Sequence, residues 1–193
     1  MHRFLLVCLV LVAAASCGRG RADGIPTNRV DSVIPWDSAL ARFRAPLPEV
    51  TSLEPSAPSL GSLIDTFLVR LERADTAGLL ALTMTPAEFG WLYYPTVPEA
   101  RPPYDLAPDL MWFMIEGNGR RSLTTLLDER AGRPLHVLDW RCDPPKEWGA
   151  NRVHAPCLLT RLQAEGDTLT ERLFGPIVER DGRFKFVNLA AKL

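Results

Sequence analysis

One carboxylate in this 193-residue chain has a setting suited to acid–base chemistry. Asp139 lies between apolar residues in the segment LHVLDWRC, residues 135–142. Burial of a carboxylate raises its pKa toward the range in which it works as a general base. A cation on a neighbouring strand, such as Arg161 or Arg172, would instead form an ordinary ion pair with it. We expect the ion pair, and Asp139 is therefore only a weak candidate for catalysis.

A second group comes from GWLYYPTVPEARPPYDLAP, residues 90–108, which holds all three tyrosines of the chain. Tyr93, Tyr94, Arg101 and Tyr104 are candidates for the rim of a pocket, because a phenol carries a polar tip on an apolar ring and arginine stacks on such rings. Alternatively, these side chains pack a proline-rich connection into an ordered cap. We favour packing, since buried aromatic residues more often fill space than catalyse.

Cys142 and Cys157 form the third group. In an exported protein they are expected to form a disulfide, which closes a loop of about 15 residues. Two alternatives are reduced thiols and a zinc site that adds His136 and His154. The spacing of these four residues matches no usual zinc finger. We therefore predict a disulfide, with no metal and no cofactor.

The N-terminus, MHRFLLVCLVLVAAASCGRG, indicates export. A basic start precedes an apolar run over residues 4–15 and then small residues, as in a signal peptide. The run is shorter than the roughly 20 residues of a membrane-spanning helix. Residues 14–17, AASC, resemble a bacterial lipobox, although Ala14 stands where leucine is usual. The resemblance implies a signal peptide over residues 1–16 and a lipid on Cys17.

Simple secretion is the rival interpretation, because Ala13 and Ala15 also form an A-x-A cleavage site. It would leave an odd number of cysteines, with one exposed thiol near the new N-terminus. Lipidation of Cys17 removes the odd cysteine, and we therefore favour a lipoprotein. A mass measurement of the mature N-terminus distinguishes the two.

Composition predicts a globular domain behind a tether. The chain is 47% hydrophobic and 23% charged, with 22 basic and 23 acidic residues, so nucleic acid is not an expected partner. Residues 17–56 contain scattered prolines and no sustained period, which indicates a flexible, lipid-anchored tether. Trp36 is the expected point at which this tether docks. Residues 57–193 form the predicted domain.

The first half of this domain has helical patterns. Apolar residues from Leu60 to Leu71 recur on one helical stripe. Thr85 and Glu88 form a capping box around a new helix start. The segment LMWFMIE, residues 110–116, is apolar almost all round, which predicts a buried helix. Gly117 and Gly119 are expected to interrupt it.

After residue 132 the hydrophobic period changes to two, which predicts strands. Leu138, Trp140 and Cys142 should share one face of the first strand. Asp181 and Gly182 favour a type I′ hairpin turn, which needs positive φ at both central residues. We predict an α+β fold with N-terminal helices packed on a bent, antiparallel four-stranded meander.

Helices first and a meander last, closing on ERDGRFKFVNLA, resembles the nuclear-transport-factor-2-like superfamily, with its ketosteroid-isomerase-like and polyketide-cyclase-like members. The resemblance covers roughly residues 60–189. It implies a cone-like fold, in which a bent sheet wraps round a helix and encloses a pocket. The tyrosine and proline stretch replaces a short strand or hairpin that the family usually has. No motif transfers the family's catalytic acid and tyrosine to positions of this chain.

Anchoring is the clearest functional signal. We predict a non-catalytic lipoprotein of the bacterial cell envelope, held to a membrane through Cys17 and facing the periplasm or exterior. Its domain would bind a small apolar ligand or an envelope protein. One alternative is an isomerase- or cyclase-type enzyme that uses Asp139 with a tyrosine, and another is a purely structural envelope protein. A cavity of about 300 Å³ or more with convergent polar groups favours binding or catalysis over the structural role.

Overall fold

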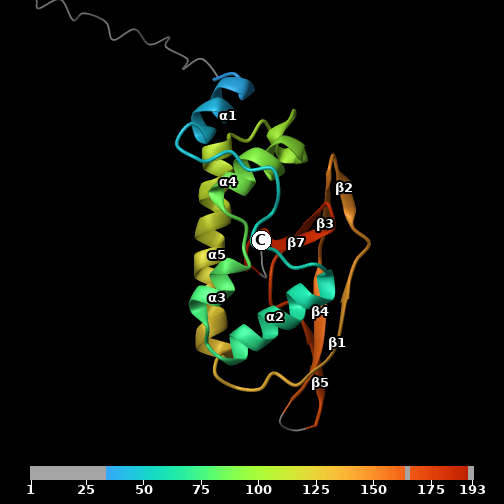
Figure 1. Ribbon diagram of the computed structural model, residues 1–193. Helices are drawn as coiled ribbons and strands as arrows, with labels where there is room; N and C mark the ends of the chain where they lie inside the picture. Colours follow the sequence, from blue (N-terminus) through green and yellow to red (C-terminus); the bar gives the residue numbers. More distant parts are fainter. Residues whose placement is uncertain (1–33, 164–165, 191–193) are drawn as a thin grey trace, which may run out of the picture. The chain divides into compact units, whose positions relative to one another are not determined.

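The computed structural model describes residues 34–163 and 166–190 of the chain (Figure 1). The predicted signal peptide and Cys17 lie outside the described residues. The described part of the predicted tether, residues 34–56, contains a helix and a loop in which Leu53 is buried. Trp36, the expected docking residue, begins this helix and packs against the buried residues of the domain.

Helices occupy the first two thirds of the described chain. They are α1 (Trp36–Arg44), α2 (Leu60–Glu72), α3 (Thr76–Ala81), α4 (Pro86–Glu88), the π-helix η1 (Phe89–Tyr93), the 3₁₀-helices η2 (Tyr94–Thr96) and η3 (Pro98–Ala100), and α5 (Pro108–Arg130). α4 and η1 to η3 follow one another almost without a gap. The tyrosine and proline stretch is therefore a series of short helical turns as far as Ala100, followed by a loop that leads to α5.

The strands are β1 (Val137–Cys142), β2 (Lys146–Trp148), β3 (Asn151–His154), β4 (Cys157–Leu162), β5 (Thr168–Glu171), β6 (Ile177–Arg180) and β7 (Arg183–Phe186). They form two antiparallel sheets, in the orders β1–β4–β5 and β2–β3–β6–β7, and neither sheet is closed. The predicted α+β class, with helices before antiparallel strands, is confirmed. One four-stranded meander was expected, but two sheets are present.

Prolines account for the division into two sheets. Pro144 and Pro145 separate β1 from β2, and Pro156 separates β3 from β4. Proline has no N–H to donate to a ladder, so a strand stops or bends where it occurs. The β1–β4 and β2–β3 pairings thus lie on opposite sides of the same interruption.

The first hydrophobic cluster lies between α2, the C-terminal half of α5 and strands of both sheets. Leu63, Ile64, Phe67 and Leu71 of α2 are fully buried, which confirms the predicted stripe. Phe67 is in ring contact with Phe174 and Phe186, whose own centroids are 4.8 Å apart. These rings fill the space between α2 and the strands.

The second hydrophobic cluster joins α1, the short turns from α4 to η3 and strands β3 and β6. Phe89 is at its centre and contacts the rings of Phe43, Tyr94 and Trp112 at centroid distances of 5.3–5.5 Å. Leu40 of α1 is 3% exposed. α1 therefore belongs to the packed domain through its apolar side.

Helix α5 differs from its prediction in two ways. It runs without a break through Gly117 and Gly119. A Cβ on Gly119 would lie 3.3 Å from the Cβ of Asn188, so this glycine allows the segment after β7 to approach the helix closely. The residues before the glycines were expected to be buried all round, but Phe113 is 71% exposed. This half of α5 packs only through one side, which includes Trp112.

β1 also departs from simple alternation. The register shifts between Val137 and Asp139, as in a β-bulge. Val137 and Trp140 therefore pack against the first cluster, whereas Leu138, expected to face the same way as Trp140, is 60% exposed. The extra residue at the bulge reverses the direction of the side chains before it.

Two local predictions are confirmed. Thr85 and Glu88 form the capping box at the start of α4. Asp181 and Gly182 have φ values of 51° and 70° in the turn between β6 and β7. Both features depend on residues close together in the chain, which is why sequence alone identifies them.

Candidate functional site

A cavity of about 400 Å³ lies between α3 and the residues after it, one side of α5 and the segment that follows β7. Its wall is largely apolar. The main apolar residues are Leu80, Met84, Trp112, Ile115, Leu123 and Leu189. Sites for small molecules usually have volumes of about 300–1,000 Å³ and similar apolar walls. The cavity is thus large enough for a small ligand.

One wall of the cavity is a stripe of side chains on α5. The opposite wall is formed where the chain after α3 is hydrogen-bonded to the end of β7. Trp112, Ile115, Gly119 and Leu123 follow the i, i+3, i+4 spacing that brings helix residues to one side. Opposite them, the N–H of Met84 donates to the carbonyl oxygen of Phe186 at 2.8 Å. This bond holds the chain after α3 beside the end of β7.

Polar groups of the cavity already have partners within the protein. Glu116 and Arg120 form an i, i+4 ion pair at 2.6 Å, with side chains 42% and 75% exposed. Asn188 is buried; its amide nitrogen donates to the oxygen of Ile115 at 3.3 Å, and its oxygen accepts from the N–H of Ala190 at 3.0 Å. A ligand would therefore gain mainly apolar contacts, with the Glu116–Arg120 pair at the solvent side.

The four residues predicted for a pocket rim do not line this cavity. Tyr93 and Tyr94 are 4% and 1% exposed and belong to the second cluster. Burial raises the pKa of both phenols further above its ordinary value, so ionisation near neutral pH is even less favourable than for an exposed tyrosine. Tyr104 is 68% exposed, and Arg101 lies 4.0 Å above the Trp36 ring. The burial of Tyr93 and Tyr94 and the stacking of Arg101 fit the packing interpretation, whereas the exposed side chain of Tyr104 does not.

Asp139 is exposed on β1, where it is paired in register with Thr160 of β4. The burial on which its suggested catalytic role depended is absent. Arg161, one of its two expected cation partners, binds Glu171 instead. Burial opposes ionisation of Glu171, but hydrogen bonds from Arg161 and Arg130 outweigh it and lower the pKa of this carboxyl group.

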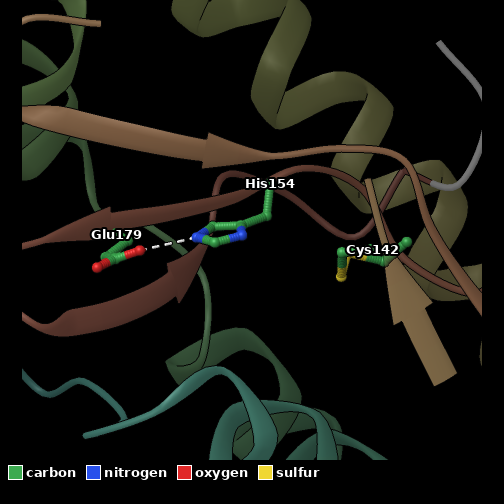
Figure 2. Close-up of a disulfide and its surroundings, with 4 residues drawn as sticks. Cys142, His154 and Glu179 are labelled. Carbon is green, nitrogen blue, oxygen red and sulfur yellow. Dashed lines mark hydrogen bonds and ion pairs between the residues drawn. A yellow bond between two sulfur atoms is a disulfide. The ribbon is translucent and has the colours of Figure 1, made fainter. Parts of the chain in front are cut away.

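Cys142 and Cys157 form the predicted disulfide, which joins paired positions of β1 and β4. Figure 2 shows this disulfide together with a nearby polar contact between side chains. In that contact, Nε2 of His154 lies 2.8 Å from Oε2 of Glu179. Arg152 also binds Glu179, at 3.1 Å. His154 is thus engaged by a carboxylate. Over residues 34–163 and 166–190, no group of three or more His, Cys, Asp or Glu side chains is arranged to hold a metal.

Sequence analysis missed the cavity. The sequence feature that could have indicated it is the stripe of residues from Trp112 to Leu123 on one helix. Because we expected the helix to break at Gly117 and Gly119, the two halves of this stripe were assigned to separate segments. The contributions of Leu80 and Leu189 come from distant parts of the chain, and no local pattern relates them to α5.

Comparisons with known proteins provide no relative: no family model, no curated protein and no solved structure matches the chain. Among the residues that the structure describes, no helix is both long and apolar enough to cross a membrane.

Proposed function

We propose that this chain is an exported, lipid-anchored protein of the bacterial envelope that binds a small, mostly apolar ligand without catalysis. The observation that carries the binding role is the 400 Å³ cavity between α3, α5 and the segment after β7. A ligand in this cavity would remove largely apolar walls from water, which is favourable. The signal peptide and the lipobox-like residues that end at Cys17 support the anchor.

The fold we propose is a variant of the nuclear-transport-factor-2-like cone. Helices that precede antiparallel strands, with α2 packed across them, support this resemblance. In such a cone the pocket would lie between helix and sheet. Phe67, Phe174 and Phe186 occupy that space here. Binding would therefore have moved to the space between α5, α3 and the segment after β7.

The arrangement of ionisable groups supports a binding role over an isomerase- or cyclase-type reaction. Asp139 is exposed and is not part of the cavity lining, and Tyr93 and Tyr94 are packed in the second cluster. General acid–base catalysis needs a titratable group within hydrogen-bonding reach of the substrate. Glu116 is the carboxylate in the lining, and Arg120 already binds it.

A neutral apolar dye, N-phenyl-1-naphthylamine, tests the cavity in the purified mature protein. We expect its fluorescence to rise on binding. Leu80→Glu places a charge on the cavity wall and should weaken binding at least about tenfold, equivalent to about 1.4 kcal/mol. Val69→Glu is the matched control, because Leu80 and Val69 are 48% and 44% exposed and Val69 is on α2. Equal affinities for the two variants would contradict the proposal.

Mass spectrometry of the mature N-terminus tests the anchor separately. We expect a diacylated or triacylated Cys17 as the first residue. An unmodified start at Ser16 or Cys17 would contradict lipidation while leaving the dye experiment unaffected. Native mass spectrometry of protein purified from its own membrane would then show whether a ligand remains bound.

A further inference from the structure

Large apolar side chains gather on the solvent-facing surface at one end of the domain. This apolar end consists of Ile34, Tyr104, Leu110, Phe113 and Met114, which are between 48% and 71% exposed. Leu110, Phe113 and Met114 share one side of α5 through their i, i+3, i+4 spacing. A soluble domain rarely exposes such a group unless it contacts something.

Packing holds the parts of the apolar end together. The guanidinium of Arg101 lies 4.0 Å above the Trp36 ring, close to Ile34 in the chain, and the N–H of Tyr104 donates to the oxygen of Arg101. Tyr94 stacks on Trp36 and donates to the oxygen of Leu106. α1 also packs against α5, and Figure 1 shows α1 beside the N-terminal end of α5.

The position of the apolar end in the chain favours a bilayer as its partner. Ile34 is 17 positions after Cys17, and an extended chain spans at most about 3.3–3.6 Å per residue, or roughly 60 Å in all. A lipid on Cys17 therefore keeps a bilayer within reach of this end of the domain.

The residue types also suit a bilayer surface. Tyrosine and tryptophan are enriched where hydrocarbon meets water, and arginine can extend its charge toward the headgroups. Charged residues in the segments of the apolar end have both signs: Asp37, Asp105 and Asp109 are acidic, and Arg42 and Arg101 are basic. Apolar contact, and not attraction to anionic lipids, would therefore dominate the interaction.

We propose that the apolar end lies on the lipid bilayer and inserts Leu110, Phe113 and Met114 at the level of the headgroups. This contact rests on the proposed anchoring through Cys17. The anchor keeps the protein at the membrane, and the apolar end orients the domain there. An anchor combined with a second apolar contact holds a protein more firmly than either alone.

Photo-crosslinking tests this orientation in the full-length protein in its own membranes. Benzoylphenylalanine is placed at Phe113 and, as the matched control, at Leu138, which is 60% exposed on β1. We expect lipid adducts at least about fivefold more abundant at position 113 than at position 138, because only the former enters the bilayer surface. Circular dichroism of both labelled proteins checks that the fold is retained.

Three results would overturn the proposal: equal lipid adducts at the two positions, adducts of position 113 with a second copy of this chain, or adducts with a different protein. The N-terminal mass of the same sample separates this inference from the anchor. Acylated Cys17 without lipid adducts at position 113 would refute the membrane contact alone. Unmodified Cys17 with those adducts would refute the anchor alone.

Discussion

The two hydrophobic clusters are formed by different kinds of chain. Regular elements build the first cluster, where a stripe of α2 meets strands through Phe67 and its aromatic neighbours. Short turns and α1 build the second, where side chains also bond to the backbone: Asn151 donates to the oxygen of Leu92 at 2.8 Å, and Tyr94 to that of Leu106. Irregular backbone leaves more groups unpaired, so it needs such bonds when it is buried. The comparison indicates that the second cluster depends more on individual polar contacts.

The largest expected effect comes from a buried ion pair between α4 and β7. Lys185 of β7 binds both oxygens of Glu88 at 2.8 and 3.0 Å, and the two side chains are 1% and 2% exposed. Lys185→Met would leave a buried carboxylate without its cation and should lower the free energy of unfolding by about 3–5 kcal/mol. Urea denaturation measures this loss.

Two further variants serve as controls for the ion pair. Glu88→Gln combined with Lys185→Met removes both charges and should recover part of the lost stability. Arg120→Met breaks an exposed pair with Glu116 and should cost less than about 1 kcal/mol. A loss for Lys185→Met as small as that for Arg120→Met would show that the clusters do not depend on this pair.

The disulfide provides the next largest effect and acts beside the first cluster. Replacing both Cys142 and Cys157 by alanine should lower the free energy of unfolding by about 3 kcal/mol, because the 15-residue loop is no longer closed in the unfolded chain. Urea denaturation gives the magnitude, and amide hydrogen exchange should increase most in β1 and β4. Chemical reduction of the unaltered protein should give a similar loss. Faster exchange confined to η1 would contradict this assignment.

Asn151→Ala probes the second cluster. Asn151 is 1% exposed and also donates to Oγ1 of Thr96 at 2.8 Å. Its removal leaves the carbonyl oxygen of Leu92 without this donor, so we expect a loss of about 1–3 kcal/mol in urea denaturation. Asn118→Ala is the control, because Asn118 bonds only with the solvent-facing side chain of Arg121 among the bonds described. Equal losses for the two variants would refute a special role for the buried amide.

The smallest effect is expected where α1 meets the turns. Arg101→Gln removes the cation above the Trp36 ring and should cost about 0.5–1 kcal/mol, as is typical of an exposed cation–π contact. Hydrogen exchange of α1 amides measures this change more directly than global unfolding. Arg101→Lys keeps the charge and should retain part of the protection. Unchanged exchange in Arg101→Gln would show that the cation above the Trp36 ring does not help to hold α1.

Local chemistry explains which structural predictions succeeded. The capping box of Thr85 and Glu88 and the Asp181–Gly182 turn each depend on residues at most three positions apart. The stripe of α2 is a periodic pattern that buries one side wherever the helix packs. The disulfide prediction followed from a pair of cysteines in a chain with an export signal.

Structural predictions failed where packing or pairing with another element determined the local structure. Each glycine in a helix costs up to about 1 kcal/mol, and this cost predicted a break in α5. Asn188 packs closely against Gly119, where a side chain would require the neighbouring segment to shift. This contact offsets the cost of the glycine. Likewise, alternation placed Leu138 with Trp140, but pairing of β1 with β4 introduced a bulge.

By itself, the sequence determined the α+β class, the caps, the hairpin turn and the cysteine pair, because short-range geometry and hydrophobic period carry that information. Only the tertiary structure decided that Glu88 meets Lys185 and that Leu80, Trp112 and Leu189 line one cavity. These contacts join residues that are from 32 to 109 positions apart in the chain. The relative placement of such segments depends on how whole elements pack, and no local pattern encodes it.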